Sequence, residues 1–259
     1  MPDFNPSSFD LPVAEIIPAV KKSLSATPTL IIQAPPGAGK STLLPLTLLN
    51  EPWLAGKKIL LLEPRRLATK SIAQRMANML GEELGQTVGY RIRFDTCISA
   101  STRLEVITEG ILTRMLHQDN ALEEDGMVIF DEFHERNLFS DVGLALCREV
   151  QQVIREELRI VLMSATIDSE QLSKLLHAPV IQSKGRQYPV EVNYLQEVDE
   201  YAIGEDAARQ IIPLTKQHSG DFLVFLPGQG DIRKAEEVLK RALPSDLIVP
   251  IFGQLNFSE

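Results

Sequence analysis

Short apolar runs alternate with segments of helical periodicity along the first two thirds of the chain. The apolar runs cover residues 29–34, 58–63, 103–108, 127–130 and 158–166. The segments in which apolar residues recur at helical spacing cover residues 40–49, 67–80, 109–118 and 140–157. Short buried runs that alternate with helices are typical of a parallel sheet. The pattern therefore predicts an α/β domain with a parallel sheet and helices on both faces.

The composition changes after Ser183, where the segment KGRQYPV at 184–190 has no periodicity. Beyond it, the alternation restarts, with strands expected near 190–195, 221–228 and 247–253 and helices near 205–217 and 231–243. We therefore predict one domain at 1–184 and a second at 185–259. Since three strands make an incomplete α/β domain, we expect the chain to be the N-terminal part of a longer protein.

Composition and charge exclude several classes of protein. Hydrophobic residues make up 44% and charged residues 24% of the 259 residues, which is ordinary for a soluble globular protein. No apolar run is long enough to span a bilayer, and the N-terminus lacks a signal peptide pattern, so we expect no membrane partner. Cys97 and Cys147 show no CxxC spacing, which favours reduced thiols and a cytoplasmic protein. The net charge of −9 argues against a generally basic nucleic-acid binder and leaves a local basic groove open.

The stretch APPGAGKS at 34–41 follows the first apolar run and opens a helical segment. It matches the phosphate-loop pattern GxxxxGK[ST], except that Ala34 replaces the first glycine. Glycines permit positive φ and close approach of the backbone to a phosphate, and a helix N-terminus adds its dipole. In this interpretation, Lys40 reaches the terminal phosphates of a nucleotide and Ser41 ligates Mg²⁺. The alternative is a glycine-rich turn with an incidental lysine, and the strand–loop–helix context disfavours it.

The stretch DEFH at 131–134 lies at the end of another apolar run, 91 residues after Lys40. Because the carboxyl ends of parallel strands share one edge, Asp131 and Glu132 are expected to face the same phosphates. Asp131 is then placed to hold Mg²⁺, and Glu132 to orient or deprotonate an attacking water. The alternative for an acidic pair after a strand is a helix N-cap, and His134 by itself would be a structural histidine. The phosphate loop elsewhere in the chain favours the catalytic interpretation.

Several stretches occur together and in order: APPGAGKS, EPRRLATKSIAQRMA, VGYRIRF, TEG, DEFHER, SAT and FLPGQGDI. This series resembles the motifs of superfamily 2 helicases of the DEAH/RHA group and is most similar to the bacterial HrpB type. The resemblance extends from about residue 30 to residue 255. It implies a RecA-like P-loop domain at 1–184 and a partial second RecA-like domain at 185–259. It also implies an ATP-dependent nucleic-acid helicase or translocase that hydrolyses ATP or another NTP with Mg²⁺.

The resemblance implies roles for residues around the nucleotide. The positions matching its phosphate-binding motif are Pro36, Gly37, Ala38, Gly39, Lys40, Ser41 and Thr42. Asp131 and Glu132 match the second motif, with Glu132 as the base. His134 is expected to connect the nucleotide site to the coupling motif, which is formed by Ser164, Ala165 and Thr166. Arg75 matches a residue that stacks on adenine. No motif for reading the base stands before Thr29, which implies loose base specificity.

The nucleic-acid side involves two further strand ends. PRRLATK at 64–70 places adjacent arginines there, and TEG at 108–110 adds a hydroxyl and a glycine. The resemblance implies that these segments grip the backbone of a single strand, with RNA expected from the family. The matching positions are Pro64, Arg65, Arg66, Thr108, Glu109 and Gly110. Backbone contact predicts little sequence preference and strong salt dependence. Without the resemblance, a solvated surface pair is the favoured interpretation of Arg65 and Arg66. Arg91 and Arg93 could join the groove or form ion pairs. The oligomeric state stays open.

The chain also departs from the resemblance, because no stretch like QRxGRAGR is present up to Glu259. Arginines of this kind can contribute about 10³–10⁵ in rate. We therefore expect this chain to bind nucleotide, to be nearly inactive in hydrolysis and to unwind nothing by itself. One alternative is a nucleotide-gated scaffold that binds nucleic acid without unwinding. The intact set of Lys40, Ser41, Asp131 and Glu132 argues against it. A metabolic P-loop kinase would have no use for the ordered nucleic-acid and SAT motifs.

Overall fold

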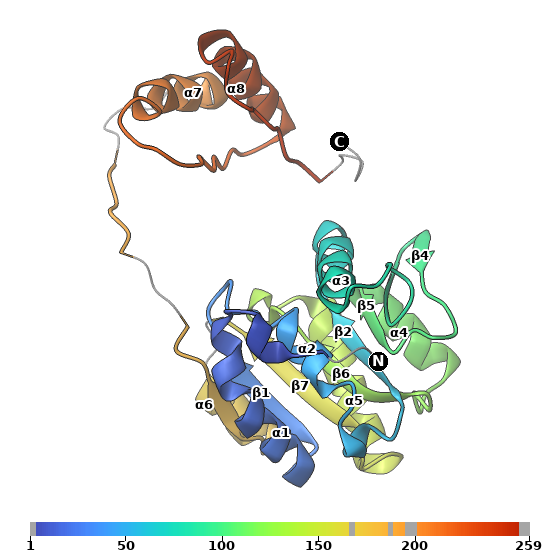
Figure 1. Cartoon of the computed structure of the whole chain (residues 1–259). Helices are drawn as coiled ribbons and strands as arrows, with labels where there is room; N and C mark the ends of the chain where they lie inside the picture. The colour runs from blue at the N-terminus through green and yellow to red at the C-terminus, as the bar shows by residue number, and fades with distance from the viewer. Residues whose placement is uncertain (1–3, 166–168, 186–188, 195–200, 254–259) are drawn as a thin grey trace. The chain divides into compact units, whose positions relative to one another are not determined.

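The computed structural model describes residues 4–165, 169–185, 189–194 and 201–253 (Figure 1). The chain divides into two compact units, Met1–Tyr188 and Pro189–Glu259. The predicted boundary after residue 184 lies four residues before this division. Among the described residues, no helix is long and apolar enough to cross a membrane.

The described part of the first unit contains an eight-stranded sheet in the order β4-β3-β5-β2-β6-β7-β1-β8. The strands are β1 (Thr29–Gln33), β2 (Lys58–Leu62), β3 (Val88–Ile92), β4 (Asp95–Cys97), β5 (Leu104–Ile107), β6 (Asp125–Phe130), β7 (Arg159–Ser164) and β8 (Val180–Gln182). All neighbouring strands pair in parallel except β3 and β4, which form an antiparallel hairpin. The five apolar runs of the sequence became β1, β2, β5, β6 and β7, so the predicted parallel sheet is confirmed.

Helices cover both faces of this sheet, as predicted. The helices of the first unit are α1 (Ile17–Ala26), α2 (Leu43–Leu48), α3 (Arg66–Leu80), α4 (Glu109–Gln118), α5 (Leu138–Val153) and α6 (Ser169–Leu176). Shorter 3₁₀ turns are η1 (Pro6–Ser8), η2 (Pro12–Ile16), η3 (Pro52–Leu54) and η4 (Phe133–Glu135). Side chains of α1, α2 and α3 pack in one apolar cluster, and side chains of α4, α5 and α6 pack in another. The sheet lies between the two clusters and supplies alternate residues of each central strand to each of them.

The alternation is clearest along β2. Ile59 and Leu61 belong to the first cluster, whereas Leu60 and Leu62 belong to the second. Because successive side chains of a strand point to opposite faces, a strand covered on both sides is apolar at nearly every position. This requirement explains the unbroken apolar runs of the sequence and fixes where each strand ends in a polar loop.

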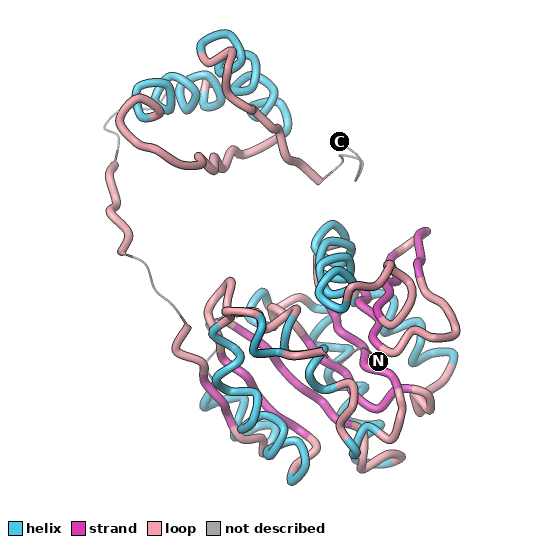
Figure 2. Tube along the Cα trace, in the orientation of Figure 1, coloured by secondary structure: helices cyan, strands magenta, loops and turns pink. Residues whose placement is uncertain are grey.

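The second unit contains α7 (Ile203–Leu214) and α8 (Gln229–Ala242), close to the predicted helices. They meet closely at Gly204, where a Cβ atom would come within 2.3 Å of the Asp231 carbonyl oxygen. The three strands predicted here do not form in the described residues of this unit, where Figure 2 shows the segments outside the helices as loop. Apolar side chains in these segments are exposed, such as Phe225 at 87% and Leu247 at 92%. In the described residues of this unit, no neighbouring strand pairs with their backbone. An apolar run becomes a strand only where neighbouring strands pair with its backbone N–H and C=O groups. The sequence of the run does not show whether such neighbours exist.

Candidate functional site

Five strands of the first unit end side by side along one edge of the sheet. In the parallel register, Gln33 of β1 pairs with Ser164 of β7, and Leu162 of β7 pairs with Phe130 of β6. Leu62 of β2 pairs with both Phe130 of β6 and Ile107 of β5. The loops that follow these strands carry the residues singled out in the sequence. The expectation that they share one edge is therefore met (Figure 1).

The loop after β1 has the backbone that its glycines suggested. Gly37 and Gly39 have φ values of +75° and +90°, where side chains with a Cβ atom are strained. At Gly39, an added Cβ would also lie 2.9 Å from Leu11 Cδ1. The segment containing Leu11 is fixed against this loop, because the Val13 N–H donates to the Ala38 carbonyl at 2.9 Å. Pro36 and Gly37 stay exposed at the tip.

The helix that follows this loop is shorter than predicted. It was expected to begin at Lys40, but α2 begins at Leu43, because Thr42 has φ −116° and ψ −67° and does not continue a regular helix. The N–H groups of Thr42, Leu43 and Leu44 all point to the Gly39 carbonyl, at 3.3, 3.0 and 3.4 Å. These amides are therefore satisfied within the turn, and a phosphate would be held by the loop and Lys40.

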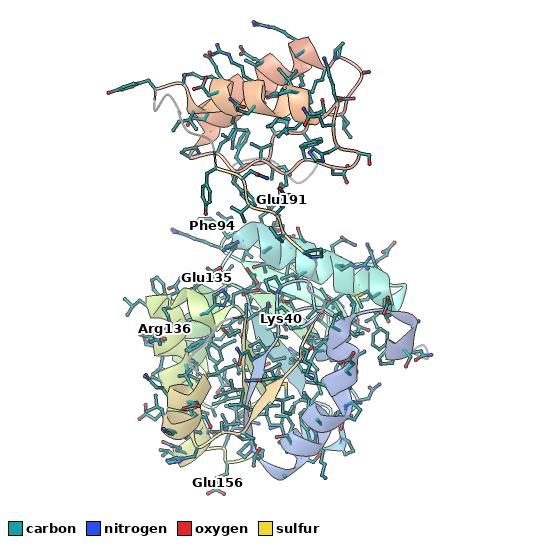
Figure 3. All side chains as sticks on the ribbon, turned by 90° about the vertical axis from the view of Figure 1, so that its left-hand side faces the viewer. Lys40, Phe94, Glu135, Arg136, Glu156 and Glu191 are labelled. Carbon is teal, nitrogen blue, oxygen red and sulfur yellow. The ribbon has the colours of Figure 1, made fainter. Side chains whose placement is uncertain are left out.

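Lys40 brings the two halves of the predicted nucleotide site together. Its Nζ atom lies 2.6 Å from Glu132 Oε1 and 4.0 Å from Asp131 Oδ1. Lys40 is 3% exposed and Asp131 is 2% exposed, so both charges lie out of water. A buried ammonium needs carboxylate partners, and these two come from a strand end 91 residues away. Figure 3 shows Lys40 at the edge of the sheet where these loops lie.

Asp131 has the features of a metal ligand. Burial raises the pKa of its carboxyl group to about 6, and Lys40 and Ser41 oppose this rise. Its Oδ2 atom is buried and accepts no hydrogen bond from the described residues. An oxygen left in this way beside a hydroxyl suits Mg²⁺, which prefers oxygen ligands and keeps contacts to phosphates. In the described part of the chain, no cluster of three or more acidic, His or Cys side chains could hold a metal. Asp131 and the nearby Ser41 are the residues of this site that could hold Mg²⁺.

The acidic pair does not cap a helix, which excludes the alternative considered from the sequence. Asp131 Oδ1 accepts a hydrogen bond from the Glu132 N–H at 2.8 Å. Helix α5 is capped instead by Asn137, whose side chain accepts from the Phe139 N–H at 2.9 Å. Glu132 has a left-handed backbone with φ +48°. Its side chain is thereby directed toward Lys40 rather than along a helix.

His134 and the SAT segment both lie near the site, and the predicted link between them stays a prediction. His134 Nδ1 is 3.3 Å from Glu132 Oε2 without making a hydrogen bond. The Ser164 hydroxyl is buried and has no hydrogen-bond partner among the described residues, whereas its carbonyl accepts from the Ala34 N–H at 3.0 Å. The backbone at the end of β7 is thus hydrogen-bonded to the start of the phosphate loop. Ala165 is half-buried, and Thr166 lies outside the described residues.

The two arginines after β2 are exposed and each has a partner in another motif. Arg65 Nη2 lies 2.5 Å from Glu135 Oε1, and Arg66 Nη2 donates to the Arg93 carbonyl at 3.1 Å. Pro64 is half-buried and fixes the chain direction between β2 and α3. The alternative left open for Arg91 is decided in favour of an ion pair, since its Nε lies 2.6 Å from Glu105 Oε2.

The segment after β5 is only partly suited to a nucleic acid. Thr108 is half-buried and Gly110 is exposed at the start of α4. Glu109 was predicted to contact nucleic acid, but its carboxylate is buried and accepts from the Ser140 hydroxyl at 2.7 Å. A carboxylate would repel phosphate, and here it ties α4 to α5. Arg75 lies exposed on α3, and its contact with adenine stays a prediction.

Sequence reasoning missed Glu63, which directly follows β2 and is 3% exposed. Burial and then the nearby Asp131 raise the pKa of its carboxyl group to about 8. Its Oε1 accepts from the Arg65 N–H at 3.3 Å. A glutamate directly after four leucine and isoleucine residues was the available signal, because a buried strand seldom ends in an unpaired acid.

Comparisons with known proteins show which family the chain is similar to. A family model for the DEAD/DEAH box helicase matches residues 14–175. The chain is 46% identical over 251 residues to the ATP-dependent RNA helicase HrpB of Escherichia coli (strain K12), covering 96% of this chain and 31% of that protein. It is 33% identical over 251 residues to the probable ATP-dependent RNA helicase DHR2 of Saccharomyces cerevisiae, covering 93% of this chain and 34% of that protein.

A solved structure, the crystal structure of the Escherichia coli DEAH/RHA helicase HrpB, matches with a TM-score of 0.86 and 47% identity. The match covers 92% of this chain and 30% of that one. The chain thus spans about a third of the length of these relatives.

Proposed function

The chain belongs to the DEAD/DEAH box helicase family, and from this premise we propose that it carries the ATP-hydrolysing site of an ATP-dependent RNA helicase. The observation that carries the proposal is the contact of Lys40 with both Glu132 and Asp131 at 2.6 and 4.0 Å. A lysine of a phosphate loop and an acidic pair at the end of another strand of the same sheet are the groups that phosphoryl transfer to water requires. Named relatives that are ATP-dependent RNA helicases support the same activity.

Each residue then has a defined task. The loop from Pro36 to Thr42 would surround the phosphates, and Lys40 would bind the terminal one. A γ-phosphate that binds Lys40 competes with Glu132 for the ammonium group, so the Glu132 carboxylate becomes available to accept a proton from the attacking water. Asp131 and Ser41 would hold Mg²⁺, which neutralises charge on the phosphates when bound.

The neighbouring strand ends would hold the nucleic acid. Arg65 and Arg66 present exposed guanidinium groups, which suit phosphates, and Thr108 and Gly110 present a hydroxyl and an unhindered backbone. None of these groups reads a base, so a single strand would be bound through its backbone. Preference for RNA rests on the relatives named above. It requires a contact to the 2′-OH, which a comparison of RNA and DNA strands tests directly.

The experiment is ATP hydrolysis by the full-length protein with and without single-stranded RNA or DNA. It compares the wild type with Glu132→Gln, and Glu156→Gln serves as a control that removes one exposed carboxylate from the opposite end of the sheet (Figure 3). We expect one polymer to stimulate the wild type and Glu132→Gln to lower the rate by about 10²–10⁴-fold. Nucleotide binding should survive the substitution. A rate that neither polymer changes, or that persists in Glu132→Gln, would contradict the proposal.

A further inference from the structure

Arg65 makes a contact that the proposed function does not explain. Its guanidinium Nη2 atom lies 2.5 Å from Glu135 Oε1, although its side chain is 71% exposed. Glu135 follows the catalytic pair in the same turn, and its side chain is 29% exposed. A carboxylate on this guanidinium occupies the position that the oxygens of a phosphate would take.

The turn that carries Glu135 also carries Glu132. The Glu135 N–H donates to the Glu132 carbonyl at 2.9 Å, which closes the turn on itself. Glu132 and Arg136 have φ values of +48° and +49°, in the left-handed region that residues with a Cβ atom seldom adopt. Side chains from elsewhere must therefore hold the turn in this conformation.

Two further contacts anchor the turn on its other sides. Phe133 is 2% exposed and packs edge-on against Phe130 at a centroid distance of 6.3 Å. Arg136 Nη2 lies 3.2 Å from Asp141 Oδ2 in α5. The contact of Glu135 with Arg65 is the anchor that reaches the nucleic-acid side, and Figure 3 shows Glu135 and Arg136 at the same end of the sheet as Lys40.

The other basic groups near Arg65 are held differently. Arg66 is held by the backbone carbonyl of Arg93, and Lys70 Nζ lies 2.5 Å from Asp95 Oδ2 in the β3–β4 hairpin. Of these three cations, Arg65 is the one paired with the turn that contains the catalytic base. A phosphate that binds Arg65 thus has an effect on that turn which a phosphate on Arg66 or Lys70 does not have.

We propose that Glu135 is a positioning residue that links nucleic-acid binding to the placement of Glu132. A backbone phosphate displaces Glu135 from Arg65, and the released turn moves the Glu132 backbone to which Glu135 is hydrogen-bonded. Exposed ion pairs of this kind contribute little stability, so a phosphate replaces the carboxylate at small cost. This inference rests on the proposed function, because it assigns a strand to Arg65 and a catalytic role to Glu132.

A double-mutant cycle in the full-length protein tests the link. The variants are Glu135→Gln, Arg65→Ala and the pair, with Glu156→Gln as the matched control for loss of one carboxylate. For each, binding of labelled single-stranded RNA is measured directly, and ATP hydrolysis is measured as the RNA concentration rises. These titrations give the half-saturating RNA concentration, the saturated rate and the rate without RNA as separate quantities.

We expect Glu135→Gln to lower the half-saturating RNA concentration about two- to fivefold, the range that an exposed ion pair supports. The rate without RNA should change as well, so that the stimulation by RNA becomes smaller. Both effects should vanish when Arg65 is already alanine. Glu135→Asp, which keeps the charge but shortens the reach to Arg65, should behave like Glu135→Gln.

The outcomes separate this inference from the function it builds on. If the wild type neither binds nor responds to RNA or DNA strands, the proposed function fails and the inference fails with it. If the wild type responds, but Glu135→Gln matches Glu156→Gln or acts equally in the Arg65→Ala background, the inference alone is overturned. Wild-type behaviour of Glu135→Asp would likewise overturn it, because a charge effect would then replace the contact.

Discussion

The strand ends along the functional edge fall into two groups that differ in burial. The loops that follow β1 and β6 carry Lys40 and Asp131, whose charges are almost fully removed from water. The basic residues after β2, Arg65 and Arg66, are exposed, although the acids Glu63 and Glu109 that follow β2 and β5 are buried. Buried charges interact strongly and require fixed partners, whereas exposed charges are screened by salt and exchange partners easily. The first arrangement suits a reaction on phosphates, and the second suits a backbone that must be gripped and released.

The largest expected effect is on ATP hydrolysis, and it comes from substituting a buried charged residue. Replacing Lys40 with alanine should lower ATP hydrolysis by at least about 100-fold, because it removes a fixed charge that faces the reacting phosphate. Binding of single-stranded RNA without nucleotide should stay close to that of the wild type, since Lys40 is far from solvent at 3% exposure. Hydrolysis rates and RNA binding of the full-length protein check both statements.

Lys22→Ala provides the control for this variant, because Lys22 is an exposed lysine of α1. If Lys40→Ala still hydrolyses ATP at the wild-type rate, the assignment of the buried charges to the reaction on phosphates is wrong.

A smaller effect is expected from the exposed group. Replacing Arg65 and Arg66 together with alanine should weaken RNA binding about tenfold or more and leave nucleotide binding unchanged. The slope of log affinity against log salt should become shallower by about 0.7 for each phosphate that the protein no longer binds. Binding titrations at several salt concentrations measure this slope, again with Lys22→Ala as control. An unchanged slope would mean that these arginines contact no phosphate.

The smallest expected effect is on the pH dependence of stability, and it comes from Asp125. This residue lies at the other end of β6 and is buried like Asp131. Burial, then Glu105, raises the pKa of Asp125 to about 7, and Lys58 opposes this rise. Between about pH 4 and pH 7, the folded chain therefore binds more protons than the unfolded chain, so the free energy of unfolding falls as the pH rises. Asp125→Asn should flatten this fall, because the amide does not titrate.

Urea unfolding of the two proteins at pH 5, 6, 7 and 8 measures the effect. The buried Glu63, with a pKa of about 8, should leave a residual slope in both. Curves that run parallel from pH 5 to pH 7 would contradict the assignment to Asp125 and would place the titration elsewhere.

Much of the first unit could be predicted from the sequence, because its central strands are covered on both faces and are mostly apolar. The hairpin of β3 and β4 was missed, since β3 carries Arg91 among its apolar residues and β4 has only three residues. The extended segments of the second unit were overpredicted, because apolarity does not reveal whether a ladder partner exists. Pairing is a property of the whole sheet and is absent from any single run.

For the site, motif spacing placed the right loops on one edge and did not give the contacts between them. The pairing of Arg65 with Glu135 and the burial of Glu109 on Ser140 depend on side chains far apart in the sequence. The resemblance grouped Glu109 with Thr108 and Gly110 as nucleic-acid contacts. Its position at the start of α4, packed against α5, decided otherwise.

The strand order also has a consequence for synthesis. Within this sheet, β1 is synthesised before its partners β7 and β8, so Thr29 cannot pair until Ile160 has been made. At about 5–20 residues per second, this delay is on the order of ten seconds. During that time the apolar side chains of Leu30, Ile31 and Ile32 have no sheet to enter. The same topology that places the phosphate loop beside the SAT segment therefore exposes an aggregation-prone strand in each nascent chain, which gives chaperones a defined segment to protect.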